Sequence, residues 1–478
     1  MDNQELFITY LTAKEDMTTE WFKNHQPQFI HKLKPVHKIT VTDDVFGGEL
    51  GTLFRIQIEY MYEQEEEDEE NQINNLKNKQ EYQEQQKYNQ DEESEAPEQL
   101  IVKIPKVGQT TYLGKDAKLF HNEILAYKLI CPQNSELFPK VYFSEIDLNL
   151  DNFIIVMEDL TLRKGKVDYQ FGCNDVEASI AAVKNLAQFH GKYLHYWKNP
   201  TFDQTAQNDR YLANQGLGHL NTHFKLFYLG FTVLNPQLQK QISSPNFGKF
   251  NLENQGTIVK SILDNWPKFM NLALTMNFSE TEFENLQIKE KAEKLSKLVN
   301  FAEVYENNIF SFLNHKIRSI IHNDFRFGNI QIDNETQKIK VFDWQLTGVG
   351  NPLWDLYYFL QNAFDGEEKK KHEIGMLKIY SQTLINEIKH TKEERLVKII
   401  TYENLLKQYK RCMWMGSAMS LSIYPLIIGH IKNVKEILNN NMQLVFIKSY
   451  VQQILDLYEY FFEIEQSDAQ EQKQNNEK

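Results

Sequence analysis

One segment of the chain gathers side chains that could carry out phosphoryl transfer. Residues 320–356 read IIHNDFRFGNIQIDNETQKIKVFDWQLTGVGNPLWDL. A His-x-Asp-x-x-x-x-Asn pattern begins at His322, and Asp343 follows the second of two short apolar runs. Phosphoryl transfer requires a carboxylate that orients and deprotonates the attacking hydroxyl, and oxygen ligands for the magnesium ions that bridge the nucleotide phosphates. The segment supplies this set of groups in one compact unit and therefore indicates a kinase.

The two apolar runs predict the hairpin that would position these groups. Residues 330–332 and 339–342 flank the turn-forming sequence Asp-Asn-Glu, which is typical of two short strands joined by a turn. Asp and Asn at strand ends are often only turn residues, and Asp333 and Asn334 fit that simpler role. For the other polar residues the functional interpretation is favoured, because the hairpin ends in Phe-Asp-Trp and is followed by Asn-Pro-Leu-Trp-Asp-Leu.

Five strands are predicted in the first third of the chain. The segments rich in Ile, Val, Thr, Tyr and Phe are residues 38–45, 53–60, 100–105, 140–143 and 153–157. The first two are joined by a stretch with three glycines, Gly47, Gly48 and Gly51, which would let the backbone approach a phosphate group. Because Gly-Gly is also a common hairpin turn, a phosphate-binding loop and a simple turn both remain open.

A lysine lies within the third strand, at Lys103. A single strand lysine is usually only solvated, but this one precedes a segment of helical pattern, residues 120–130, that contains Glu123. In kinases such a lysine contacts the nucleotide phosphates and is held by a helix glutamate. The fifth strand ends in Glu158-Asp159-Leu160, where the backbone would be placed to hydrogen-bond an adenine edge and Leu160 would mark the crossing into a second lobe.

An acidic, low-complexity segment interrupts the predicted sheet. Residues 61–98 consist mainly of Glu, Gln, Asn and Lys, and such a composition predicts a disordered insertion. This segment carries about −11 of the net charge of −14, so the rest of the chain is close to neutral. Since the chain has no basic footprint, the charge argues against binding to nucleic acid.

The remainder of the chain is predicted to be mainly helical. At 478 residues, with 41% hydrophobic and 13% aromatic residues, the chain is long enough for two or three domains or one large two-lobed domain. A helix is predicted to follow Asp175, with His190 as a hydrogen-bonded core residue, and another is predicted over residues 283–298. We expect a helical N-terminal extension over residues 1–37, a first lobe over 38–160, a helical second lobe over 161–463 and a polar tail over 464–478.

Three observations concern the compartment. The cysteines, Cys131, Cys173 and Cys412, are too far apart in sequence for a metal or redox motif and are expected to be buried in a reducing environment. The first residues carry acids and no long apolar core, so no secretory signal is predicted. No apolar run is long enough to span a bilayer. These features predict a cytoplasmic protein.

Taken together, these motifs resemble the aminoglycoside phosphotransferase and choline kinase superfamily, and in particular its ecdysteroid-kinase-like branch. The resemblance runs over residues 38–360 and is carried by the glycine hairpin, Lys103, Glu123, the Met-Glu-Asp-Leu sequence at 157–160, the His-Asn-Asp loop, the Phe-Asp-Trp sequence and Asn-Pro-Leu-Trp-Asp-Leu. It implies an α+β, protein-kinase-like fold of two lobes. The first lobe would contain an antiparallel sheet, and the second would be mainly helical.

The resemblance also implies roles for individual residues. Asp324 would be the catalytic base, Asn329 and Asp343 would bind Mg²⁺, and Lys103 with its partner Glu123 would bind the phosphates of ATP. The acceptor would be a hydroxyl group of a small metabolite, and Asp355 would support the catalytic loop.

Several departures from the family pattern bear on function. Trp344 and Gln345 follow the metal-binding aspartate and no activation segment follows, which is similar to small-molecule kinases and unlike protein kinases. Asn323 replaces the more usual glycine between the histidine and the aspartate. Arg326 is a candidate contact for a substrate anion, although a surface ion pair explains it equally well. The altered glycine hairpin and the acidic insertion leave an alternative open, a catalytically silent kinase fold that acts as a scaffold or interaction protein.

Overall fold

The chain folds into two compact units. The first comprises Met1–Gly114 and Pro139–Leu162, and the second comprises Lys115–Phe138 and Arg163–Lys478. The computed structural model describes residues 10–29, 36–47, 51–60, 97–106, 119–147, 152–165, 172–194, 266–278, 283–297, 317, 319–333, 335–389, 394–429, 431–437 and 441–464. The predicted acidic insertion, apart from its last two residues, and the polar tail, apart from its first, lie outside these ranges.

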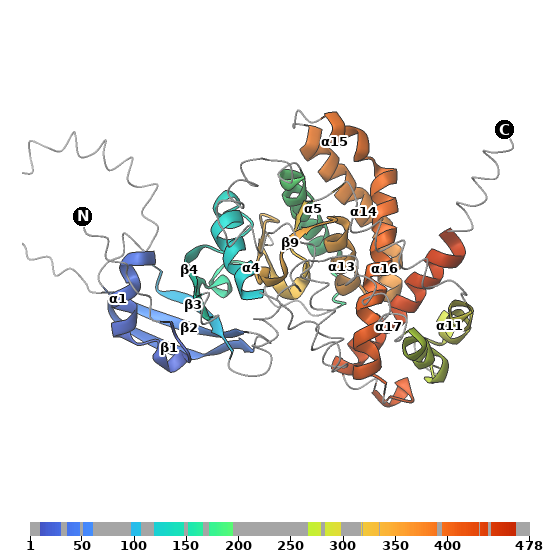
Figure 1. The fold of residues 1–478 in the computed structure, drawn as a ribbon, viewed down its shortest axis with the longest axis horizontal. Helices are drawn as coiled ribbons and strands as arrows, with labels where there is room; N and C mark the ends of the chain where they lie inside the picture. The colour runs from blue at the N-terminus through green and yellow to red at the C-terminus, as the bar shows by residue number, and fades with distance from the viewer. Residues whose placement is uncertain are drawn as a thin grey trace, which may run out of the picture. The chain divides into compact units, whose positions relative to one another are not determined.

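A five-stranded antiparallel sheet forms the first unit (Figure 1). Its strands lie in the order β1-β2-β3-β5-β4. They span Val36–Gly47 (β1), Gly51–Tyr60 (β2), Gln99–Pro105 (β3), Val141–Asp147 (β4) and Asn152–Glu158 (β5). All five agree with the predicted strands to within a few residues, because period-two alternation of apolar residues marks a sheet surface that packs on a core.

One face of this sheet packs against the N-terminal helix α1, Thr19–Phe29. Phe54, Val102 and Val156 come from three neighbouring strands and form a core with Trp21 and Phe22 of the helix. Lys103 follows Val102 in β3, so its side chain points to the opposite face of the sheet. In the ladder Lys103 lies opposite Leu53 of β2 and Ile155 of β5.

The second unit contains short strand pairs and many helices. Its strands are β6 (Ser319–Ile321), which pairs with β9 (Gly348–Gly350), and β7 (Ile330–Ile332), which pairs with β8 (Ile339–Val341). Its labelled helices are α4 (Leu119–Leu125), α5 (Val176–Tyr193), α11 (Ile288–Ser296), α13 (Leu353–Ala363), α14 (Gly366–Lys389), α15 (Glu394–Ile399), α16 (Tyr402–Ile427) and α17 (Asn441–Glu459). Helix α5 begins where predicted, because Asp175 caps it by accepting the backbone N–H of Ala178.

The segment that contains α4 belongs to the second unit. The ring of Phe138 stacks on that of Trp344 with 4.2 Å between centroids, and the Leu137 carbonyl accepts the backbone N–H of Val341. Both Phe138 and Trp344 are fully buried. The sequence gives no sign of these contacts, because the partners are about two hundred residues apart.

Two further expectations are corrected. The helix predicted over 283–298 is shorter, since Gln287 adopts a left-handed conformation with φ of 52° and separates a short 3-10 turn from α11. Of the three cysteines, Cys412 is buried as expected, but Cys131 and Cys173 are only half-buried. Cys131 begins a short 3-10 helix, Cys131–Gln133, and Cys173 lies just before α5.

The chain enters the second unit next to the β7–β8 hairpin. The Gln331 side chain in β7 is buried, and its Nε2 donates to the Lys164 carbonyl at 2.8 Å. Among the described residues, no helix is long and apolar enough to cross a membrane.

Candidate active site

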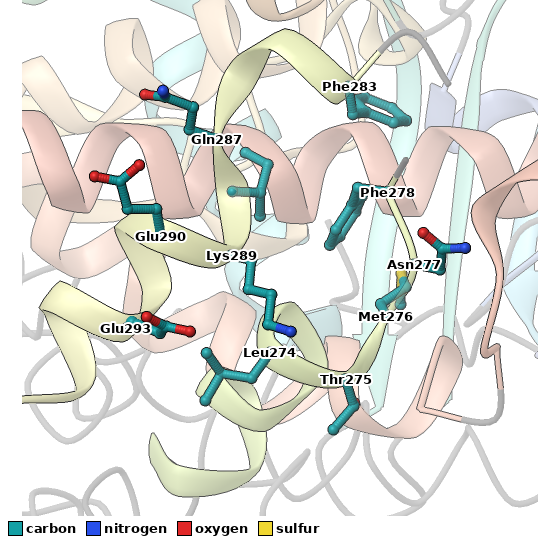
Figure 2. A pocket seen from close by; sticks show the side chains of 11 residues that line it. Leu274, Thr275, Met276, Asn277, Phe278, Phe283, Gln287, Lys289, Glu290 and Glu293 are labelled. Carbon is teal, nitrogen blue, oxygen red and sulfur yellow. The ribbon is translucent and has the colours of Figure 1, made fainter. Parts of the chain in front are cut away.

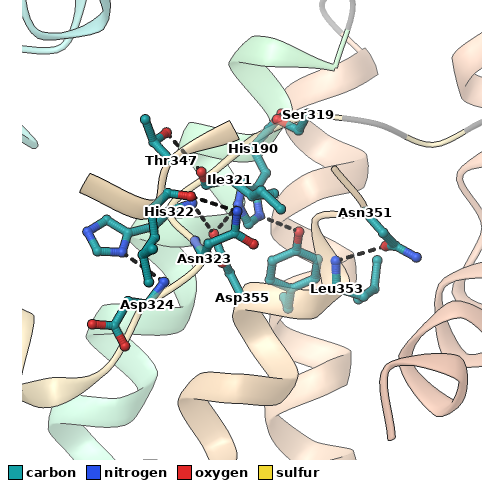
Figure 3. Close-up of polar contacts among 12 residues, drawn as sticks. His190, Ser319, Ile321, His322, Asn323, Asp324, Thr347, Asn351, Leu353 and Asp355 are labelled. Atoms are coloured by element: carbon teal, nitrogen blue, oxygen red, sulfur yellow. Dashed lines mark hydrogen bonds and ion pairs between the residues drawn. The ribbon is translucent and has the colours of Figure 1, made fainter. Parts of the chain in front are cut away.

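The loop between β6 and β7 carries the His-Asn-Asp sequence and is held by one buried carboxylate (Figure 3). Asp355 in α13 accepts the backbone N–H of His322 at 2.6 Å and that of Asn323 at 2.8 Å. Its side chain is completely buried. Two charge-assisted hydrogen bonds to consecutive amides fix the path of the loop just before Asp324. Asp355 therefore supports the loop, as the sequence predicted.

A second pair of buried side chains holds Asp355 in turn. His190 Nε2 lies 3.2 Å from Asp355 Oδ2, and His190 Nδ1 lies 2.7 Å from the Tyr380 hydroxyl. Because a carboxylate only accepts, Nε2 carries the hydrogen and Nδ1 accepts from Tyr380. Burial, together with the charge of Asp355, raises the pKa of Tyr380 well above its usual value, so the phenol keeps its proton. His190 is thus a hydrogen-bonded core residue, as predicted.

His322 braces the loop against the hairpin. Its Nε2 lies 3.0 Å from the Phe342 carbonyl, and its Nδ1 accepts the backbone N–H of Asp324 at 3.2 Å. The carbonyl fixes the hydrogen on Nε2, which leaves Nδ1 free to accept. The imidazole also packs edge-on against Trp344. His322 therefore joins the loop that carries Asp324 to the end of β8.

The departure at position 323 has a structural explanation. Asn323 adopts a left-handed backbone with φ of 69°. Glycine tolerates this conformation best, and asparagine is among the few other residues that adopt it readily. The Asn323 Nδ2 also donates to the Leu346 carbonyl at 2.8 Å. Asparagine thus keeps the loop conformation and adds one hydrogen bond.

The Asp324 carboxylate has donors on both sides. Asn329 Nδ2 lies 2.8 Å from Asp324 Oδ2 and 2.9 Å from the Asp324 carbonyl. Arg326 Nε lies 3.2 Å and 3.4 Å from the two carboxylate oxygens. The side chain is 15% exposed, so part of it can be reached from solvent. The sequence placed these residues in one loop but did not predict which groups hold the carboxylate.

Asn329 and Asp343 meet at the open end of the β7–β8 hairpin. The Asn329 carbonyl accepts the backbone N–H of Phe342 at 3.1 Å, directly beside the Ile330–Val341 pair of the ladder. Asp343 has a left-handed backbone with φ of 64°, which turns the chain out of the strand at this point. Its Oδ2 accepts from Gln345 Nε2 at 3.3 Å.

The donor set at this point fits Mg²⁺. The amide group of Asn329 points both of its hydrogens at Asp324, which leaves Oδ1 as an oxygen ligand. Among the described residues there is no cluster of three or more His, Cys, Asp or Glu side chains that could hold a metal. Such a cluster is not required, because Mg²⁺ typically takes one or two carboxylates from the protein and the remaining oxygens from water and phosphates.

In the first unit, the structure describes Lys103 and two of the three predicted glycines. Lys103 is 5% exposed. A β-carbon at Gly51 would lie 3.0 Å from Lys103 Cε, so the lysine side chain runs directly over this glycine. Gly47 ends β1 opposite Thr52, while Gly48 lies outside the described residues. Glu123 in α4 is 1% exposed and belongs to the second unit, so the two residues predicted to pair are placed in separate units.

The segment predicted to bind an adenine edge is tied to Lys140 at Glu158. The Glu158 amide donates to the Lys140 carbonyl at 2.9 Å, and Glu158 Oε1 accepts the Lys140 amide at 2.7 Å. Both groups are therefore used within the sheet. Leu160 is buried and begins a 3-10 turn, Leu160–Leu162.

Asp159, the residue after Glu158, has a structural role that was not predicted from the sequence. Its carboxylate is 1% exposed and accepts from Arg55 Nε at 2.6 Å and Gln99 Nε2 at 2.8 Å. Thr161 also donates to it, through its amide and its hydroxyl. Burial alone would raise the pKa of Asp159, but these hydrogen bonds and the Arg55 charge hold it below its usual value. The partners come from β2, β3 and the turn after β5, so no local pattern reveals them.

Tyr358 also belongs to the candidate site and was not predicted. Burial raises the pKa of its phenol well above the usual value, and the adjacent Asp324 charge raises it further. It lies in α13, three residues after Asp355. The sequence of α13 is typical of a buried apolar helix. It does not indicate that one of its tyrosines lies next to the carboxylate of Asp324.

A pocket of about 650 Å³ lies elsewhere in the second unit (Figure 2). It is lined by residues 274–278 and by α11 with the turn before it, and it includes Phe278, Phe283 and Lys289. None of the predicted site residues lines it.

Comparison with known proteins identifies the family. The ecdysteroid kinase-like family model matches residues 47–393. Among curated proteins, no sequence matches this chain. Similar solved structures include the choline kinase of Cryptosporidium parvum Iowa II, with 12% identity and a TM-score of 0.42 over 88% of this chain and 89% of that one.

Two other solved structures are similar at comparable levels. The ethanolamine kinase of Plasmodium vivax has 11% identity and a TM-score of 0.33 over 93% of this chain and 92% of that one. An amicoumacin kinase in complex with AMP-PNP and Ca²⁺ has 12% identity and a TM-score of 0.33 over 87% of each chain. Because the family match covers more than half of the sequence, the chain belongs to the ecdysteroid kinase-like family and is a small-molecule kinase.

Proposed function

We propose that the protein transfers the γ-phosphate of ATP, with Mg²⁺, to a hydroxyl group of a small metabolite. The observation that carries the proposal is the arrangement of Asp324, Asn329 and Asp343. A partly exposed carboxylate lies in the same loop as an amide oxygen suited to a metal, and Asp343 lies just after the paired strand β8. Phosphoryl transfer depends mainly on positioning and charge stabilisation, which these groups supply.

In this mechanism Asp324 accepts the proton of the attacking hydroxyl. The hydrogen bonds that the two preceding amides donate to Asp355 hold the loop, so Asp324 is oriented before the substrate arrives. Asn329 Oδ1 and the Asp343 carboxylate would hold Mg²⁺, which when bound neutralises charge on the transferring phosphate. Lys103 would offset charge on the other phosphates, and Glu123 would partner it.

The acceptor is proposed to be a hydroxylated metabolite rather than a protein side chain. After Asp343 the chain forms one 3-10 turn, then β9, and begins α13 at Leu353, so no activation segment separates the metal ligand from the structural aspartate. We place the reaction in the cytoplasm, where the widely spaced cysteines of this chain would stay reduced.

The first test is a thermal-shift titration with ATP and Mg²⁺. A ligand that binds the folded state raises stability by RT ln(1 + [L]/Kd), about 2.7 kcal/mol at a hundredfold excess over Kd. We expect a Mg²⁺-dependent shift in wild type that is lost in Asp343→Ala. Asp324→Asn serves as the matched variant and should keep the shift, because this residue acts on the acceptor.

The second test measures ADP release from MgATP with choline, ethanolamine, an aminoglycoside and an ecdysteroid as candidate acceptors. Asp324→Asn should abolish any acceptor-dependent rate. Retained transfer in this variant would contradict the assigned base. No thermal shift with millimolar ATP in wild type would instead favour the catalytically silent scaffold.

A further inference from the structure

Arg326 is turned back onto the carboxylate two residues before it. Its Nε lies 3.2 Å from Asp324 Oδ1 and 3.4 Å from Asp324 Oδ2. Asn329 Nδ2 approaches Oδ2 at 2.8 Å. Two donors from the same loop therefore restrict rotation of the carboxylate, because turning it would lengthen at least one of these hydrogen bonds.

The guanidinium group lies over Gly328. A β-carbon at Gly328 would be 2.3 Å from Arg326 Nη1 and 3.2 Å from Cζ, both well inside van der Waals contact. Gly328 is not among the described glycines with positive φ, so its backbone conformation does not require glycine. The structure therefore indicates that glycine is needed at this position because the arginine side chain occupies the space of a β-carbon.

The charge of the arginine is matched by its surroundings. The Asp324 carboxylate raises the pKa of Arg326, and Tyr358 and Asp343 raise it further, against the opposing effect of burial. The Arg326 side chain is still 41% exposed. The ion pair is therefore partly solvated, and its main effect is expected on geometry rather than on stability.

We propose that Arg326, seated on Gly328, is a positioning residue that holds the Asp324 carboxylate in the orientation needed to accept the substrate proton. The inference rests on the proposed role of Asp324 as the base. It assigns Arg326 to the protein's own carboxylate and not to an anion on the substrate. Gly328 then matters only through the room it gives to the guanidinium group.

A double-mutant cycle tests this proposal. Arg326→Gln removes the charge and the Nε donor. Gly328→Ala displaces the guanidinium group but changes none of the side chains proposed to act at the site. The rate is followed as ADP release from MgATP, with water as the acceptor until an alcohol substrate is identified. We expect each single variant to lower kcat about tenfold, equivalent to about 1.4 kcal/mol, with KM for ATP unchanged.

The double variant should be no slower than Arg326→Gln alone, since Gly328→Ala has nothing left to displace. Gly375→Ala in α14 is the matched control, because a β-carbon there has no atom within 4 Å. Partial recovery of kcat in Arg326→Lys would support a charge that orients the carboxylate. Additive losses in the double variant, or a normal kcat in Arg326→Gln, would overturn the proposal.

A readout independent of catalysis separates this inference from the proposed function. The chain has seven arginines, so selective ¹⁵Nε labelling gives a simple spectrum, and the Arg326 signal is the one absent from Arg326→Gln. We expect this signal to shift in Asp324→Asn and Gly328→Ala and to stay in place in Gly375→Ala. Shifts without any turnover in wild type would refute the kinase mechanism but keep the pairing. Normal turnover in Gly328→Ala would refute the positioning role of Arg326 but keep the kinase mechanism.

Discussion

His190 Nε2 donates to Asp355 Oδ2 at 3.2 Å, and neither side chain has any exposed surface. The same carboxylate accepts two consecutive amides of the catalytic loop. The geometry of the loop thus depends on a carboxylate that has no contact with solvent and is itself oriented from α5. This dependence leads to the first prediction.

Asp355→Asn should leave the protein folded but strongly impaired. The substitution turns one of the two carboxylate oxygens into an NH2 group, which cannot accept a hydrogen bond. One of the two backbone N–H groups of the loop then loses its acceptor, so the loop before Asp324 would shift. Each hydrogen bond to a charged group contributes about 1.5–3 kcal/mol, and a 1 Å displacement of a reacting group lowers rates on the order of 100-fold. The free energy of unfolding, measured by urea denaturation, and kcat should both fall. Asp365→Asn is the control and should keep kcat, because Asp365 Oδ2 accepts from Asn174 Nδ2 at 3.0 Å and an asparagine oxygen can accept the same bond.

Asp159→Asn should destabilise the first unit in a pH-dependent way. The pKa of Asp159 is lowered in the fold, because hydrogen bonds and Arg55 outweigh the effect of burial. Its contribution is therefore complete above the unfolded pKa of about 3.9 and is lost as the pH falls through the folded value. We expect Asp159→Asn to lower the free energy of unfolding by about 2–3 kcal/mol at pH 7. The difference from wild type should become smaller below pH 4.

Urea denaturation of both proteins across this pH range measures the narrowing. Glu59→Gln is the comparison, because the Glu59 side chain is 53% exposed and its ion pair with Lys38, at 3.9 Å, should contribute little. A gap between wild type and Asp159→Asn that stays constant with pH would contradict the prediction.

Lys369→Met should be among the most destabilising single substitutions in the second unit. Lys369 Nζ lies 2.7 Å from Asp456 Oδ2 and 3.3 Å from Glu373 Oε1, and its side chain is 1% exposed. Breaking a buried ion pair by removing one partner typically costs about 3–5 kcal/mol. Thermal unfolding should show the loss, and Asp456→Asn added to Lys369→Met should recover part of it. The exposed neighbour provides a control, since Lys370→Met should change stability by less than about 0.5 kcal/mol.

Gly51→Ala should weaken nucleotide binding without unfolding the sheet. The new β-carbon would lie 3.0 Å from Lys103 Cε and 3.3 Å from the Ile104 carbonyl, so the lysine must move by a few tenths of an ångström. If Lys103 contacts phosphates as proposed, KM for ATP should rise about tenfold, which corresponds to about 1.4 kcal/mol. Lys103→Met sets the upper limit of the effect. An unchanged KM in both variants would remove Lys103 from the nucleotide site.

Replacing residues 61–96 by a short Gly-Ser turn should preserve the fold. Strands β2 and β3 stay paired up to the insertion, with Ile58 N–H donating to the Glu98 carbonyl at 2.8 Å and the Tyr60 hydroxyl to the Pro97 carbonyl at 2.7 Å. Each halving of a loop's length lowers its closure cost by about 0.6 kcal/mol. The melting temperature should therefore stay the same or rise. A large fall would mean that the insertion packs on the sheet.

The sequence predicted the elements better than their interactions. The five strands and the β7–β8 hairpin follow from short alternating or apolar runs between turn residues, which depend only on local chemistry. The β6–β9 pair was missed, because Ser319–Ile321 and Gly348–Gly350 are too short to form a pattern. The hydrogen bonds of Asp159 and the stacking of Phe138 on Trp344 were missed for another reason, since the partners are distant in sequence and burial cannot be read from a local window.

At the candidate site, the residue types and the supporting role of Asp355 were predicted, but not the contacts that hold these residues. The motif indicated Asp324, Asn329 and Asp343, and their roles remain predictions. The contacts of Asp355 with His190 and of Asp324 with Arg326 became visible only with the fold. Asn323, which looked like a departure, occupies a backbone conformation that restricts the choice of residue there.

The hydrogen bond between Gln331 and the Lys164 carbonyl has a mechanical consequence. It attaches the chain to β7 two residues after the first unit ends at Leu162. A pull on the chain at Leu162 would therefore act on β7 through Lys164 and Gln331 before it reaches α5 at Val176. The strand that takes this load pairs with β8, which ends just before Asp343.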